Sequence, residues 1–146
     1  MLGRIARAFG DALPGESGAV PMRLFPPATR IATLAPEDLI ELGLTRARAR
    51  TLIGLAHAVA SGEIRLEPES DVDATVARLT ALPGIGAWTA NYIAMRALRW
   101  PDAFLASDLV VLRAMGESRP ARALRESEAW RPWRSYAVIH LWRNAR

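Results

Sequence analysis

The sequence LPGIG at positions 82–86 constrains the fold of this chain more than any other stretch. Apolar residues recur before it with the spacing of one helix face, and after it on two faces. Pro83 ends a helix, while Gly84 and Gly86 permit positive φ and a close approach of the backbone. The stretch therefore predicts a tight turn between two helices. The free N–H groups at the start of the second helix form a potential phosphate site.

Helical periodicity continues through the rest of the chain, and no segment alternates long enough to predict a strand. One predicted helix runs from Leu2 to Leu13, the stretch 117–128 forms another, and the last begins near Pro132. Capping residues mark four further helix starts, at Thr29, Thr45, Ser107, and either Ser70 or Asp71. The prediction is a single all-α domain over residues 1–146, with a Gly-, Pro- and Ser-rich loop at Pro14–Met22.

Composition narrows the possible functions. The chain has no cysteine, which excludes disulfides, thiolate zinc sites and a cysteine-ligated iron–sulfur cluster. Its 19 basic residues are all arginine, and the formal net charge is +4, which suits phosphate recognition without proving it. No apolar run approaches the ~20 residues of a membrane span, and no secretory or transit pattern is evident at Met1, so we expect a cytoplasmic protein without a membrane partner.

Three segments, in order, carry a family resemblance: LPGIGAWTANYIAMRAL, FLASD and WRPWRSYAVIHLW. Together they resemble the helix-hairpin-helix DNA base-excision glycosylases, and within them the 3-methyladenine DNA glycosylase II family. The resemblance runs from Met1 to about Asn144. The family also has an N-terminal α/β domain and further helices before the apolar stripe that starts at Leu2. The resemblance therefore implies a helix-hairpin-helix glycosylase domain that is N-terminally truncated relative to the family.

The resemblance also implies roles for individual residues. Asp108, at the end of FLASD, takes the place of the catalytic carboxylate. Cleavage of an N-glycosidic bond builds positive charge on the sugar, which one fixed carboxylate can stabilise. Trp88 stands where related glycosylase/lyases have a Schiff-base lysine, and an indole cannot form an imine. The expected enzyme is thus monofunctional, and Trp88, Tyr92 and Trp142 form its pocket for a flipped, cationic base.

Partners and ions follow from the same resemblance. The expected partner is double-stranded DNA containing alkylated bases, and no obligate protein partner is indicated. The expected DNA-binding residues are Leu82, Pro83, Gly84, Ile85, Gly86 and Thr89. A structural monovalent cation is also implied at the hairpin, bound by the backbone carbonyls of Thr80, Leu82 and Ile85.

Simpler interpretations stand beside these. Asp108 could merely cap a helix, and the aromatic residues could belong to an ordinary core. The chain could be a non-catalytic helix-hairpin-helix module, or a glycosylase for another damaged base. We expect Asp102 to form a turn, His140 to be packed, and Trp130 and Trp133 to pack the last helix on the body.

Overall fold

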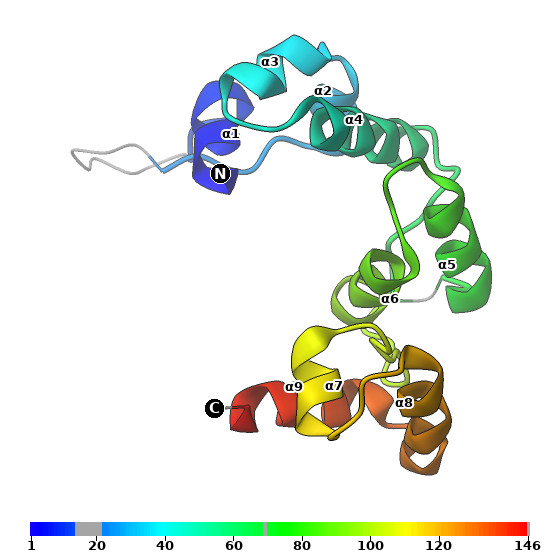
Figure 1. Cartoon of the computed structure of the whole chain (residues 1–146). Helices are drawn as coiled ribbons and strands as arrows, with labels where there is room; N and C mark the ends of the chain where they lie inside the picture. Colours follow the sequence, from blue (N-terminus) through cyan, green and yellow to red (C-terminus); the bar gives the residue numbers. More distant parts are fainter. Residues whose placement is uncertain (14–21, 69, 146) are drawn as a thin grey trace. The chain divides into compact units, whose positions relative to one another are not determined.

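The computed structural model describes residues 1–13, 22–68 and 70–145, and these form nine α-helices and one 3-10 helix (Figure 1). The only extended pairing among them is one isolated antiparallel bridge, between Ala12 and Arg23. The prediction of an all-α fold is confirmed. The predicted loop at Pro14–Met22 lies, up to residue 21, outside the described residues. Contacts divide the chain into two compact units: Met1–Ile64 with Leu82–Gly84, and Arg65–Ala81 with Ile85–Arg146.

The first unit is built around buried Ile5, Leu39 and Ala49. Thr45 caps α4 as predicted, because its hydroxyl accepts the N–H of Arg48 at 3.3 Å. The helices of this unit are α1 (Leu2–Phe9), α2 (Ala28–Ala32), α3 (Pro36–Glu41) and α4 (Arg46–Ala60).

Two predicted boundaries in this unit are wrong. The first helix ends at Phe9 instead of Leu13, because residues 11–13 pair their backbone with residues 22–24. The second begins before Thr29. Pro27 is its extended N-cap, and the Pro27 carbonyl accepts the N–H groups of Arg30 and Ile31, so Thr29 already lies inside the helix.

The second unit contains the larger core, with Phe104, Leu105, Val111 and Val138 among its buried residues. Its elements are α5 (Val72–Ala81), α6 (Ala87–Arg96), α7 (Leu109–Ala114), α8 (Pro120–Glu126), the 3-10 helix η1 (Ser127–Trp130) and α9 (Arg134–Asn144).

Three helices of this unit, α5, α7 and α8, begin beside a carboxylate that accepts backbone N–H groups. Asp71, one of the two predicted caps of α5, accepts the N–H of Ala74 at 3.0 Å. Asp108, and not Ser107, is the N-cap of α7. The polar stretch 117–128 is not one helix. The Glu117 carboxylate accepts the N–H groups of residues 118 and 119, so α8 starts at Pro120 and then gives way to η1.

The LPGIG sequence forms the turn between α5 and α6, as predicted. Gly84 has φ of +88°, whereas Gly86 has φ of −88° and is the N-cap of α6. Thr51 on α4 donates a hydrogen bond to the Pro83 carbonyl at 3.0 Å, and a Cβ at position 84 would overlap the Thr51 hydroxyl. Both the backbone conformation and the space at position 84 therefore require glycine.

Candidate active site

Asp108 is the centre of a hydrogen-bonded cluster inside the second unit. Its Oδ1 accepts three N–H groups: the Trp142 indole at 3.0 Å, the Val110 backbone at 3.0 Å and the Val111 backbone at 2.9 Å. Its Oδ2 accepts the Trp88 indole at 3.0 Å. The carboxylate therefore caps α7 and joins side chains from α6 and α9 at the same point.

These donors keep Asp108 ionised. Partial burial by itself would raise the pKa of its carboxyl group. The hydrogen bonds from Trp142, Val111, Trp88 and Val110 outweigh that effect and hold the pKa below the ordinary value for an aspartate. At neutral pH the site thus presents a fixed negative charge.

The predicted aromatic residues lie together beside this charge. The rings of Trp88 and Tyr92 stack, with centroids 5.3 Å apart and planes 6° from parallel. Tyr92 also contacts Trp142, at 6.3 Å between centroids and a tilt of 52°. Trp88 is 38% exposed, so part of its surface remains available to a ligand. The structure therefore brings together all four residues predicted for the catalytic step and the base pocket.

A cavity of about 450 Å³ lies next to the aromatic cluster in the same unit. Trp88 and Ser107 are part of its wall, but Asp108, Tyr92 and Trp142 are not. Its other wall residues come mainly from α6, α8 and the segments around η1: Ala87, Asn91, Phe104, Ala106, Pro120, Leu124, Glu128, Arg131 and Arg134. Trp88 is thus the one member of the aromatic cluster that borders this cavity.

The residues predicted to bind DNA are distributed over both units. Leu82, Pro83 and Gly84 belong to the first, where they border a cavity of about 450 Å³ with Ala47, Arg50, Thr51 and Gly54. Ile85, Gly86 and Thr89 belong to the second unit.

The predicted cation site is divided in the same way, since Leu82 lies in the first unit and Thr80 and Ile85 in the second. This site therefore stays a prediction. Across residues 1–13, 22–68 and 70–145 no group of three or more His, Cys, Asp or Glu side chains could hold a metal ion.

Asp102 lies in a turn, as predicted, but it also makes buried contacts that the sequence did not predict. It is 5% exposed and forms a two-point ion pair with Arg134, which is 4% exposed. The partners are 32 residues apart, and no local motif signals the pair.

Two predictions about individual side chains are wrong. His140 is exposed, with its Nε2 3.1 Å from the Asn144 amide nitrogen. Trp130 does pack in the core, edge-on to Phe104, but Trp133 is 57% exposed and contacts Tyr136. Within the part of the chain that is described, no helix has the length and apolar character to cross a membrane.

Comparison with known proteins finds similar chains among DNA glycosylases. Over 139 residues the chain is 37% identical to DNA-3-methyladenine glycosylase 2 of Escherichia coli, covering 95% of this chain and 48% of that protein. The chain is related to the DNA-3-methyladenine glycosylases. The Bacillus subtilis DNA-3-methyladenine glycosylase is also 37% identical, over 96% of this chain and 48% of its own length. The chain thus spans about half the length of these relatives, and no family model matches it.

Solved structures of glycosylases share the fold. The 3-methyladenine DNA glycosylase of Archaeoglobus fulgidus aligns with a TM-score of 0.77 and 25% identity, over 94% of this chain and 48% of that one. The Schizosaccharomyces pombe 3-methyladenine DNA glycosylase, solved with abasic DNA, aligns with a TM-score of 0.73 and 26% identity, over 81% and 62%. The resemblance inferred from sequence is confirmed, and the fold is that of the helix-hairpin-helix DNA glycosylases.

Proposed function

We propose that the chain carries the catalytic site of a monofunctional DNA glycosylase. In this proposal it hydrolyses the N-glycosidic bond of alkylated bases of the 3-methyladenine type, within double-stranded DNA, as a step of base-excision repair. The observation that carries the proposal is the ionised Asp108, fixed by four N–H donors beside stacked aromatic rings. The names of the relatives agree with this activity.

The two carboxylate oxygens of Asp108 differ in the number of hydrogen bonds that they accept. A carboxylate oxygen has about two lone-pair directions, so Oδ1, which already accepts three N–H groups, is saturated. Oδ2 accepts only the Trp88 indole and has room for another partner. We infer that Oδ2 faces the reaction, where it would stabilise the positive charge on the sugar and orient the attacking water.

The aromatic residues would supply the base pocket. Alkylation at N3 or N7 leaves a purine cationic, and the faces of electron-rich rings attract cations. Trp88 is the most exposed ring of the cluster and is oriented by its bond to Asp108, so a base lying on it would be close to the charged oxygen. Excision of a different damaged base is the enzymatic alternative, and a non-catalytic DNA-binding module is the other.

The substitution Asp108→Asn tests the proposed catalytic role while leaving the helix cap in place. Asparagine caps helices about as well as aspartate, and its amide oxygen still accepts the three N–H groups now at Oδ1. We expect the variant to fold and bind duplex DNA normally, while release of methyladenine from methylated DNA falls by about a hundredfold or more.

Asp71→Asn is the matched control, because Asp71 caps α5 through the N–H of Ala74 and lies on another helix. It should leave base release unchanged. Undiminished release by Asp108→Asn would exclude the assigned role. A wild-type chain that binds DNA but releases no damaged base would favour the non-catalytic module.

A further inference from the structure

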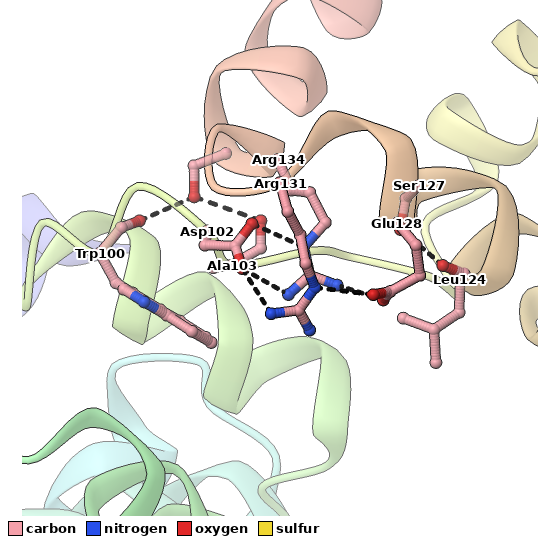
Figure 2. A network of polar contacts seen from close by, with 9 residues as sticks. Trp100, Asp102, Ala103, Leu124, Ser127, Glu128, Arg131 and Arg134 are labelled. Carbon is pink, nitrogen blue, oxygen red and sulfur yellow. Dashed lines mark hydrogen bonds and ion pairs between the residues drawn. The ribbon is translucent and has the colours of Figure 1, made fainter.

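The segment 100–108, which ends at Asp108, is anchored at its other end by the first turn of α9. The Ser135 hydroxyl donates to the carbonyls of Trp100 at 2.7 Å and Ala103 at 3.2 Å, and the Ser135 N–H donates to the Pro101 carbonyl at 2.9 Å. Arg134 adds two hydrogen bonds to Asp102, at 2.7 and 2.8 Å (Figure 2). Four successive residues of the segment, 100–103, are thus fixed by two successive residues of one helix.

The contact between Arg134 and Asp102 has a geometry that only arginine provides. The guanidinium meets both carboxylate oxygens, and both side chains are almost completely buried. Burial would raise the pKa of Asp102, but the hydrogen bonds and charge of Arg134 outweigh it and lower the pKa. Glu128 and Arg131 complete a network of four charges around the pair. A planar fork fixes distance and direction together, whereas a lysine would supply only a point charge.

The same helix also reaches the far end of the segment. Trp142 on α9 lies eight residues after Arg134, which is ~12 Å along a helix axis. Its indole N–H donates to Asp108 Oδ1 at 3.0 Å. Because a helix moves as a stiff rod, any sliding or rotation of α9 at Asp102 would displace the Trp142 indole relative to Asp108.

We propose that Arg134, assisted by Ser135, is a positioning residue that fixes α9 along the segment 100–108 and so places the Trp142 indole against Asp108. The other donors to Asp108 lie on other elements, since Trp88 belongs to α6 and the two backbone N–H groups to α7. The two indoles should therefore respond differently when this anchor is weakened. The consequence for catalysis rests on the function proposed above, but the structural consequence does not.

The indole N–H resonances of the 146-residue chain provide a test that needs no activity. Trp88→Phe and Trp142→Phe assign the two signals. In Arg134→Lys, which retains the charge and loses the fork, we expect the Trp142 indole signal to shift upfield as its hydrogen bond lengthens. The Trp88 signal should stay in place. Arg131→Lys is the matched control: Arg131 also bonds to Asp102, at 3.0 Å, but precedes α9, so both signals should be unchanged.

If Arg134→Lys fails to fold, Ser135→Ala gives the same test, because it removes two hydrogen bonds to residues 100 and 103 and no charge. A folded variant in which neither indole signal moves, or in which both move together, would overturn the inference.

Base release tests the catalytic consequence separately. In Arg134→Lys we expect kcat to fall by about ten- to a hundredfold with KM little changed, the range seen for small misplacements of catalytic groups. That loss should disappear when Trp142 is already phenylalanine. An active wild-type chain with an unchanged kcat in Arg134→Lys would contradict the inference. If the wild-type chain releases no base while the Trp142 signal still shifts, the proposed function fails and the positioning role stands.

Discussion

One carboxylate performs two tasks in this molecule. Asp108 ends the turn before α7 by accepting two backbone N–H groups, and it also binds two indoles that belong to the predicted base pocket. Both sets of N–H donors favour the ionised form, because hydrogen bonds to a carboxylate stabilise its charge. The ionisation of this single residue is therefore a sensitive measure of whether the site is correctly assembled.

Removing one indole donor should raise the pKa of Asp108. The hydrogen bond from Trp142 contributes most to lowering it, ahead of Val111 and Trp88. We therefore expect Trp142→Phe to move the titration of the Asp108 carboxyl carbon, followed by NMR, to higher pH than in the wild type. Trp88→Phe should move it in the same direction by less. The acid limb of base release should follow the same order.

The lowered pKa of Asp108 also determines how its contribution to the stability of the fold depends on pH. Because the pKa of folded Asp108 is below its ordinary value, its contribution to stability is present at neutral pH and is lost as the pH falls through the folded value. Trp142→Phe should make this contribution smaller and its loss complete at a higher pH, because the folded pKa moves toward the unfolded one. A titration that moves to lower pH in either variant would contradict the hydrogen-bonding scheme.

At the scale of elements, the two glycines of the turn between α5 and α6 are not equivalent. Gly84 has a positive φ and lies against Thr51, whereas Gly86 has an ordinary φ and open space around it. The sequence alone does not predict this difference, because either glycine could provide a turn or a close backbone approach. They are distinguished by the positive φ of Gly84 and by its contact with α4, which is remote in sequence.

Alanine substitutions should reveal this difference. Gly84→Ala forces a side chain into a left-handed conformation and against the Thr51 hydroxyl, so we expect a loss of about 1–3 kcal/mol in the free energy of unfolding. Gly86→Ala retains its backbone N–H, meets no neighbour, and should unfold like the wild type. Urea unfolding measures both. Equal destabilisation by the two substitutions would show that the turn differs from this description.

At the scale of the whole molecule, the absence of lysine limits the chemistry. All 19 basic residues are arginine, which cannot form an imine with an abasic sugar. No side chain in the sequence carries a primary amine. A Schiff-base lyase step therefore has no side chain to use.

Borohydride trapping should accordingly fail. With abasic duplex DNA and sodium borohydride, we expect no covalent protein–DNA product, as judged by denaturing gel electrophoresis. A known bifunctional glycosylase is the positive control. Acetylation of the N-terminal amine prevents it from forming an adduct, so any adduct that remains must come from another nucleophile. An adduct that persists after acetylation would contradict the assignment of a monofunctional enzyme.

Much of this architecture could be predicted from local signals. Periodicity, Thr45, Asp71 and the LPGIG turn located most helices, because caps and turns depend on neighbouring residues. The family resemblance grouped Asp108 with Trp88, Tyr92 and Trp142, and the structure brings them together. The predicted cap of α7, Ser107, is wrong: the next residue, Asp108, is also a good capping residue and accepts the N–H groups of Val110 and Val111.

Long-range charge pairing could not be predicted. Asp102 follows a proline and has the local appearance of a turn residue, and its partner Arg134 is one arginine among 19. The choice among them is made by the packing of α9 against the segment 100–103, and no periodicity encodes it. The division into two compact units likewise has no counterpart in the sequence pattern.

The N-cap position of Asp108 has an evolutionary consequence. Exchange to asparagine needs a single nucleotide change and retains the α7 cap, while the displaced N–H of the partly exposed Trp88 can bond to water. A lineage with the proposed activity could therefore lose it without passing through an unstable ancestor. We expect some related proteins to carry asparagine at this position and to keep the fold without the proposed base release.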